Sequence, residues 1–116
     1  MTNYPGRQPR KVLEGKASVD VAGKIFSMEL ADLSLGGVTL FSPTALPLST
    51  ETCVLTFSIP GQEAAHEVKV SATMSHCRYS FVYMRCRTGF QFQQMDDQVT
   101  KLITDFMAET TSPTSP

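Results

Sequence analysis

Apolar residues alternate with polar ones along most of this chain, and this period of two restricts the fold more than any other feature. In the first half the alternating apolar positions are Ala17, Val19, Val21, Phe26, Met28, Leu30, Val38 and Leu40. Successive side chains of a β-strand point to opposite faces, so the pattern indicates antiparallel strands with one buried face. The residues "AG" at 22–23 mark a turn between the first two strands.

The same pattern continues after residues 42–51, which contain two prolines and are expected to form a loop. A strand at 53–59 and a return strand at 68–74 flank the turn signal "PGQE" at 60–63. The stretch "RYSFVYMRCRTGFQF" (78–92) is rich in aromatic and β-branched residues and predicts one or two further strands. The chain is therefore predicted to be mainly β.

The hydrophobic period changes near the C-terminus. Apolar residues at helical spacing are Met95, Val99, Leu102, Ile103, Phe106 and Met107. Together they predict an amphipathic helix with Asp96 or Asp97 as its N-cap. Six or seven short antiparallel strands with regular turns favour a closed barrel or a compact sandwich, and the helix is expected to cover an open end or edge.

Length and charge limit the possible functions. The 116 residues fit one domain, and ten Lys and Arg against eleven Asp and Glu give a net charge of −1. A general nucleic-acid binder usually has a basic excess, which counts against an oligonucleotide-binding barrel that stacks bases on Phe81, Tyr83 and Phe90. Positive charge is grouped locally, at the N-terminus and at 78–87, which suits a small anionic ligand better than a long polyanion.

No catalytic or metal-binding pattern is evident. His66 and His76 lie in a strand-like region without a known catalytic frame, and His76, Cys77 and Cys86 lack the ligand spacing of structural zinc sites. We therefore expect a protein that is not an enzyme and binds no metal.

The cysteines and the hydrophobicity of the chain indicate its cellular location. The three cysteines cannot all pair, no secretory segment opens the chain, and no apolar run reaches the ~20 residues of a membrane span. A cytoplasmic protein with reduced thiols and no membrane insertion is expected.

The segment "DLSLGG" (32–37) interrupts two strands with an acid, a hydroxyl and two glycines. Asp32 and Ser34 are two residues apart, so on a strand both side chains would face the same side and could pair with a purine edge. Gly36 and Gly37 permit a sharp turn and close approach of a ligand. A simple hairpin turn explains the same residues, and the local pattern alone favours that turn.

The N-terminal residues 1–11 have no apolar periodicity and contain Arg7, Arg10 and Lys11, so they are predicted to form a flexible basic arm. Guanidinium groups bind phosphates through two parallel hydrogen bonds and stack on purines. An arm of this kind folded over Asp32 and Ser34 would make a clamp for a guanine nucleotide.

This combination resembles the PilZ domain family. "DLSLGG" matches the family's D/N-x-S-x-x-G motif through Asp32, Ser34 and Gly37, and "TGFQF" (88–92) is similar to its late strand through Gly89 and Phe92. The resemblance spans residues 7–107. It implies a six-stranded antiparallel β-barrel with a C-terminal α-helix that binds the second messenger cyclic di-GMP, without a further cofactor.

The resemblance also implies the roles of the site residues. The arm's arginines would contact phosphates and stack on guanines, Asp32 and Ser34 would contact a guanine, and Gly37 would permit the close turn. The family's second motif is R-x-x-x-R, whereas this chain has Arg7 and Arg10 three residues apart. Either Arg10 or Lys11 then fills the second position. The alternative is a protein-interaction module of the same fold that does not bind the nucleotide, because its R-x-x-x-R motif is altered.

The expected organisation is a basic arm at 1–11, a barrel domain at 12–108 and a disordered tail at 109–116. No output domain is expected within these 116 residues, and the domain is expected to signal through an unidentified protein effector in motility, pili or exopolysaccharide control. We expect a monomer or weak dimer.

Overall fold

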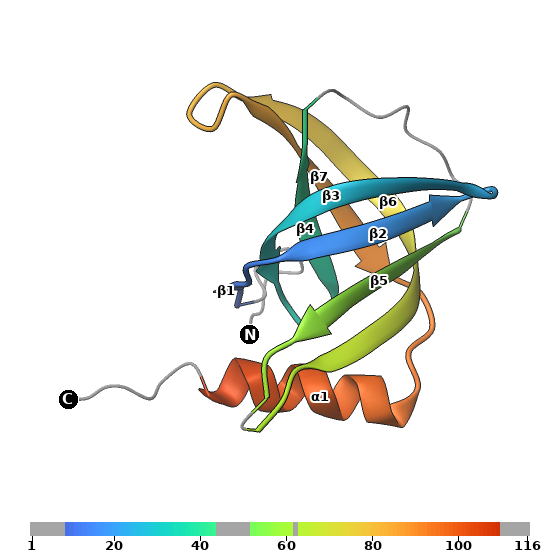
Figure 1. Cartoon of the computed structure of the whole chain (residues 1–116), viewed down its shortest axis with the longest axis vertical. Coiled ribbons are helices and arrows are strands. Elements are labelled where there is room, and N and C mark those ends of the chain that lie inside the picture. The colour runs from blue at the N-terminus through green and yellow to red at the C-terminus, as the bar shows by residue number, and fades with distance from the viewer. Residues whose placement is uncertain (1–8, 44–51, 62, 110–116) are drawn as a thin grey trace, which may run out of the picture.

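The structure, a computed structural model, describes residues 9–43, 52–61 and 63–109 (Figure 1). Its elements are β1 (Lys11–Val12), β2 (Lys16–Val21), β3 (Lys24–Leu33), β4 (Gly37–Ser42), β5 (Cys53–Ile59), β6 (His66–Ser80), β7 (Arg85–Phe92) and α1 (Asp97–Ala108). Residues 1–8 of the expected arm and 110–116 of the expected tail lie outside the described residues. Lys11, which the sequence predicts to be part of the arm, belongs to β1.

All strand pairings are antiparallel, and the sheet order is β1-β3-β2-β5-β6-β7-β4. An additional pairing between β3 and β4 closes strands β2 to β7 into a six-stranded barrel. The short β1 pairs with the end of β3, beyond the part of β3 that pairs with β2. The predicted six-stranded antiparallel barrel with a C-terminal helix is confirmed.

The barrel is filled by one face of each strand, as the alternation predicts. Fully buried side chains include Val19 on β2, Leu40 on β4 and Leu55 on β5. The helix α1 lies across one end of the barrel (Figure 1) and buries Ile103 and Phe106 against this core. A closed barrel has no free sheet edges, so its core is open to solvent only at the two ends. The amphipathic helix covers one of these ends with its apolar face.

The segment 78–92 contains the end of β6, a turn and all of β7. The hairpin of β6 and β7 extends beyond the rest of the barrel (Figure 1), with Phe81 and Tyr83 exposed at its tip. Phe90 faces the interior and is only 2% exposed. The alternative in which Phe90 stacks on nucleic-acid bases is therefore wrong, because the residue is part of the core.

The N-cap of α1 offers a direct test of the helix boundary. Asp96 accepts a hydrogen bond from the backbone N–H of Val99 at 2.9 Å. Asp96→Ala is expected to lower the free energy of unfolding by about 1 kcal/mol, measured by urea denaturation. Asp97→Ala, in the first turn of the helix, is the control and should cost clearly less because it removes only a favourable charge. Equal losses would contradict the assigned cap.

No helix in the described ranges is long and apolar enough to cross a membrane. Among the same residues, no group of three His, Cys, Asp or Glu side chains is arranged to hold a metal ion.

Candidate functional site

Asp32 lies where three strands meet. It is paired with Val12 of β1 and with Thr39 of β4. A β-bulge between Leu30 and Asp32 shifts the register of β3, so that Leu30 and Leu33 both face the core. The bulge thereby directs the Asp32 carboxylate to the outer surface of the barrel, with 14% of its side chain exposed.

Two arginines from distant parts of the chain hold this carboxylate. Arg10 donates from Nη1 to Asp32 Oδ1 at 2.9 Å and to Thr39 Oγ1 at 3.3 Å. Arg87 donates from Nη2 to Asp32 Oδ2 at 3.0 Å. Both carboxylate oxygens are thus occupied, and two guanidinium groups around a single carboxylate leave this part of the surface with excess positive charge.

The partners of Asp32 lie in a pocket of about 480 Å³ on the outside of the barrel, which is lined by Arg10, Thr39, His76, Arg78 and Arg87. The lining comes from adjacent strands. Thr39 pairs with Gly89, and Gly89 pairs with His76, while Arg87 pairs with Arg78. Three guanidinium groups therefore converge on one pocket, which makes it suitable for an anion.

Gly89 provides space for the His76 side chain of this pocket. A Cβ atom at Gly89 would lie 2.4 Å from Cε1 of His76, so the imidazole rests directly on the glycine backbone. Any larger residue at position 89 would displace His76. The glycine of the "TGFQF" stretch thus has a local purpose here, because it makes room for the His76 ring in the pocket lining.

Ser34 lies in the turn rather than beside Asp32, because β3 ends at Leu33. Its side chain is buried, its backbone N–H and hydroxyl both donate to Gly37 O at 2.9 and 3.3 Å, and its Oγ accepts from Gly36 N at 3.3 Å. The Gly36 carbonyl accepts from Phe92 N at 2.9 Å, which ties the turn to β7. The expectation that Ser34 and Asp32 project together is not what the structure shows.

Arg10 and Lys11 point to different parts of the molecule. Lys11 Nζ donates to the backbone oxygen of Phe106 at 2.8 Å and lies 4.0 Å from the centroid of the Phe106 ring. A cation there stabilises the C-terminal end of α1. Of the two candidates for the second arginine position, Arg10 lies at Asp32 and Lys11 does not. Arg7 is outside the described residues.

Residues 6–109 match the PilZ domain family. The chain belongs to this family. A comparison with curated protein sequences finds no match.

Solved structures share the fold of this PilZ domain. MotI/DgrA, the inhibitor of motility of Bacillus subtilis, aligns with a TM-score of 0.80 and 9% identity over 93% of this chain and 51% of MotI. The PilZ domain of YcgR from Escherichia coli with c-di-GMP gives 0.61 and 18% over 92% and 95%. The K. pneumonia MrkH–c-di-GMP complex gives 0.67 and 17% over 90% and 51%. This PilZ domain therefore spans about half the length of MotI and MrkH.

Sequence reasoning missed four lining residues of the pocket: Thr39, His76, Arg78 and Arg87. The group of arginines at 78–87 was a sequence signal for an anion-binding surface, since Arg85 and Arg87 are two residues apart and share a strand face. Their proximity to Asp32 depends on the register of β6, β7 and β4, which the sequence pattern does not specify.

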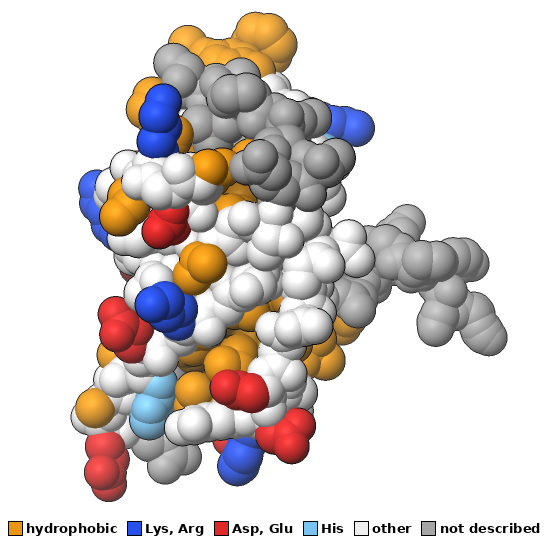
Figure 2. Space-filling model, turned by 90° about the vertical axis from the view of Figure 1, so that its right-hand side faces the viewer, with side chains coloured by type: hydrophobic (Ala, Val, Ile, Leu, Met, Phe, Trp, Pro, Cys, Tyr) orange, Lys and Arg blue, Asp and Glu red, His pale blue; other side chains and the backbone are white. Residues whose placement is uncertain are grey.

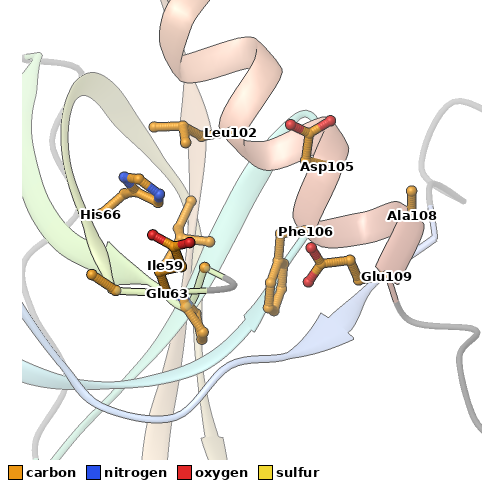
Figure 3. A pocket seen from close by; sticks show the side chains of 11 residues that line it. Ile59, Glu63, His66, Leu102, Asp105, Phe106, Ala108 and Glu109 are labelled. Carbon is orange, nitrogen blue, oxygen red and sulfur yellow. The ribbon is translucent and has the colours of Figure 1, made fainter.

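A larger pocket of about 670 Å³ lies between the β5–β6 turn and α1 of this PilZ domain (Figure 3). Its lining combines apolar side chains, such as Ile59 and Phe106, with the acidic Glu63 and Asp105. The negative charge makes this pocket unsuitable for a phosphate-bearing ligand, so size alone does not identify the functional site.

Proposed function

We propose that this PilZ domain is a receptor that binds cyclic di-GMP in the pocket beside Asp32. The observation that carries the proposal is the convergence of Arg10 and Arg87 on the Asp32 carboxylate, at a pocket that Arg78 also lines. A cyclic dinucleotide has two phosphates for guanidinium groups and two guanines whose N–H edges suit a carboxylate. The family and the c-di-GMP-bound structures of YcgR and MrkH support this ligand.

Each residue would have a separate role. Arg10 and Arg87 exchange part of their contact with Asp32 for phosphate oxygens, or stack on a guanine, as planar guanidinium groups do. Asp32 then accepts hydrogen bonds from a guanine edge. Ser34, Gly36 and Gly37 fix the turn that holds Asp32 at the end of β3, and Arg7 joins from the arm when the ligand binds.

The signal that cyclic di-GMP is bound would pass to a protein effector. On ligand binding the N-terminal arm changes conformation and the contacts of Arg10 and Arg87 are redistributed, so the surface around β1 and β4 changes. A protein partner that binds this surface then responds to the nucleotide. We propose that the protein acts in the cytoplasm of a bacterium, in the control of motility, pili or exopolysaccharide. Because the chain covers about half of MotI and MrkH, the activities of those whole proteins are not assigned to it.

One observation favours a second function. Both oxygens of Asp32 are already paired with arginines, and the arm's two arginines are three residues apart instead of four. If both arginines stay paired with Asp32 in the presence of cyclic di-GMP, the domain is a protein-interaction module that does not bind the nucleotide.

Isothermal titration of the purified chain with cyclic di-GMP at near-physiological salt separates the two functions. We expect saturable heat with cyclic di-GMP and none with GTP, because one triphosphate does not span the arginines and the carboxylate as a cyclic dinucleotide does. Absence of heat at high protein concentration would exclude the receptor and leave the interaction module.

A further inference from the structure

The tip of the β6–β7 hairpin exposes a cluster of large apolar side chains. Phe81 is 83% exposed and Val82 84%, and Tyr79, Tyr83 and Met84 are exposed beside them. The hairpin projects past the barrel (Figure 1), and hydrophobic side chains gather at that end of the molecule (Figure 2). Single exposed apolar residues are ordinary, but a group of consecutive ones marks an interaction surface.

The described contacts show that this tip is an ordered platform. The ring of Tyr83 lies 5.0 Å from that of Phe41 on β4, and the ring of Tyr79 lies 5.2 Å from that of Phe81. The backbone N–H of Tyr83 donates to Ser80 Oγ at 3.3 Å. Aromatic pairs at such distances hold each other in place. The apolar side chains are therefore presented outward in a fixed arrangement.

Positive charge flanks the tip. Residues 78–87 contain Arg78, Arg85 and Arg87 and no acidic residue. Arg85 also stacks on Phe41, with its Cζ 4.3 Å from the ring centroid, and pairs with Glu29. Arg78 is exposed and makes no ion pair within the described ranges. A partner of this surface must combine an apolar layer with negative charge next to it.

We propose that the β6–β7 hairpin docks the domain peripherally on an anionic lipid surface. Phe81 and Val82 would enter the boundary between headgroups and acyl chains, with Tyr79 and Tyr83 at headgroup level and Arg78 at the lipid phosphates. Aromatic rings favour this interface, and basic side chains add attraction to anionic lipids. This inference goes beyond nucleotide binding and shares only Arg78 with the nucleotide pocket.

The shape of the tip favours lipid over protein as the occupant. A stable protein interface buries about 800 Å² on each partner and needs shape complementarity. The tip is the end of a single projecting hairpin (Figure 1), which offers little area to a protein surface. A lipid layer adapts to an inserted hairpin end and needs no matching pocket.

The test is sedimentation of the full chain with vesicles of phosphatidylcholine alone and of phosphatidylcholine mixed equally with phosphatidylglycerol. We expect the chain to sediment with the mixed vesicles and not with phosphatidylcholine alone. The double variant Phe81→Ser, Val82→Ser should bind at least about tenfold more weakly, because it removes the apolar insertion. Ile25→Ser is the matched control: Ile25 is 69% exposed, lies on β3 near the β2–β3 turn, and should leave binding unchanged.

A second readout reports insertion directly. The chain has no tryptophan, so Phe81→Trp introduces a single tryptophan at the tip, and its emission is measured with excitation that tyrosine does not absorb. Its emission should shift to shorter wavelength with the mixed vesicles. Absence of binding to the mixed vesicles, or equal binding by the double serine variant, would overturn the proposal. So would a tip that holds two copies of the chain together, shown by loss of a dimer in the double variant without vesicle binding.

Discussion

Replacing Arg10 with alanine is expected to weaken cyclic di-GMP binding by about thirtyfold, which corresponds to the loss of about 2 kcal/mol from a charge-assisted hydrogen bond made by a half-exposed guanidinium group. Arg10 lies 2.9 Å from Asp32 and lines the pocket, so its removal takes away a phosphate partner and leaves Asp32 held by Arg87 alone. Isothermal titration of the variant measures the loss, and circular dichroism verifies that the barrel is intact.

Lys11→Ala is the matched control, since it removes one positive charge at the next residue. Lys11 contacts Phe106 at the end of α1 and not the pocket. The affinity for cyclic di-GMP should therefore stay within about twofold, whereas the free energy of unfolding should fall by about 1 kcal/mol. Loss of affinity in Lys11→Ala with retention in Arg10→Ala would show that Lys11 fills the second arginine position.

The barrel was predictable because its determinant is local. Strands such as β2 and β3 bury one face, so the alternation of Ala17, Val19 and Met28 with polar neighbours is visible without knowing the partner strand. The β6–β7 turn was not predictable in the same way. Its residues 81–84 contain no Gly, Pro or Asn, and Met84 adopts a positive φ of 56° that the sequence does not signal.

The site was predicted in part, for a related reason. Asp32 and Arg10 belong to segments with recognisable residue types, whereas the meeting of Asp32 with Arg87 across 55 residues depends on strand register. The prediction for Ser34 assumed that a strand continued past Leu33. The bulge in β3 and the turn after it changed the direction of the side chains, and neither has a distinct sequence pattern.

Gly37→Ala is expected to destabilise the domain by about 3 kcal/mol, the upper end of the cost of overpacking. A Cβ atom at this position would lie 2.1 Å from the backbone oxygen of Phe90. Phe90 cannot move away easily, because it is paired with Val38 and its side chain is in the core. The last glycine of the "DLSLGG" motif is therefore required for packing β4 against β7. Urea denaturation of the variant measures the loss.

Gly23→Ala separates this steric effect from backbone strain. Gly23 has a φ of +90° and nothing within 4 Å of a built Cβ, so alanine there is strained without a clash. Its cost should be nearer 1 kcal/mol, the penalty of a left-handed backbone. Equal losses at both glycines would mean that β4 and β7 can separate to accept a methyl group. The close approach at Gly37 would then be unnecessary for the fold, and the glycine's role would have to lie in the contact with the nucleotide.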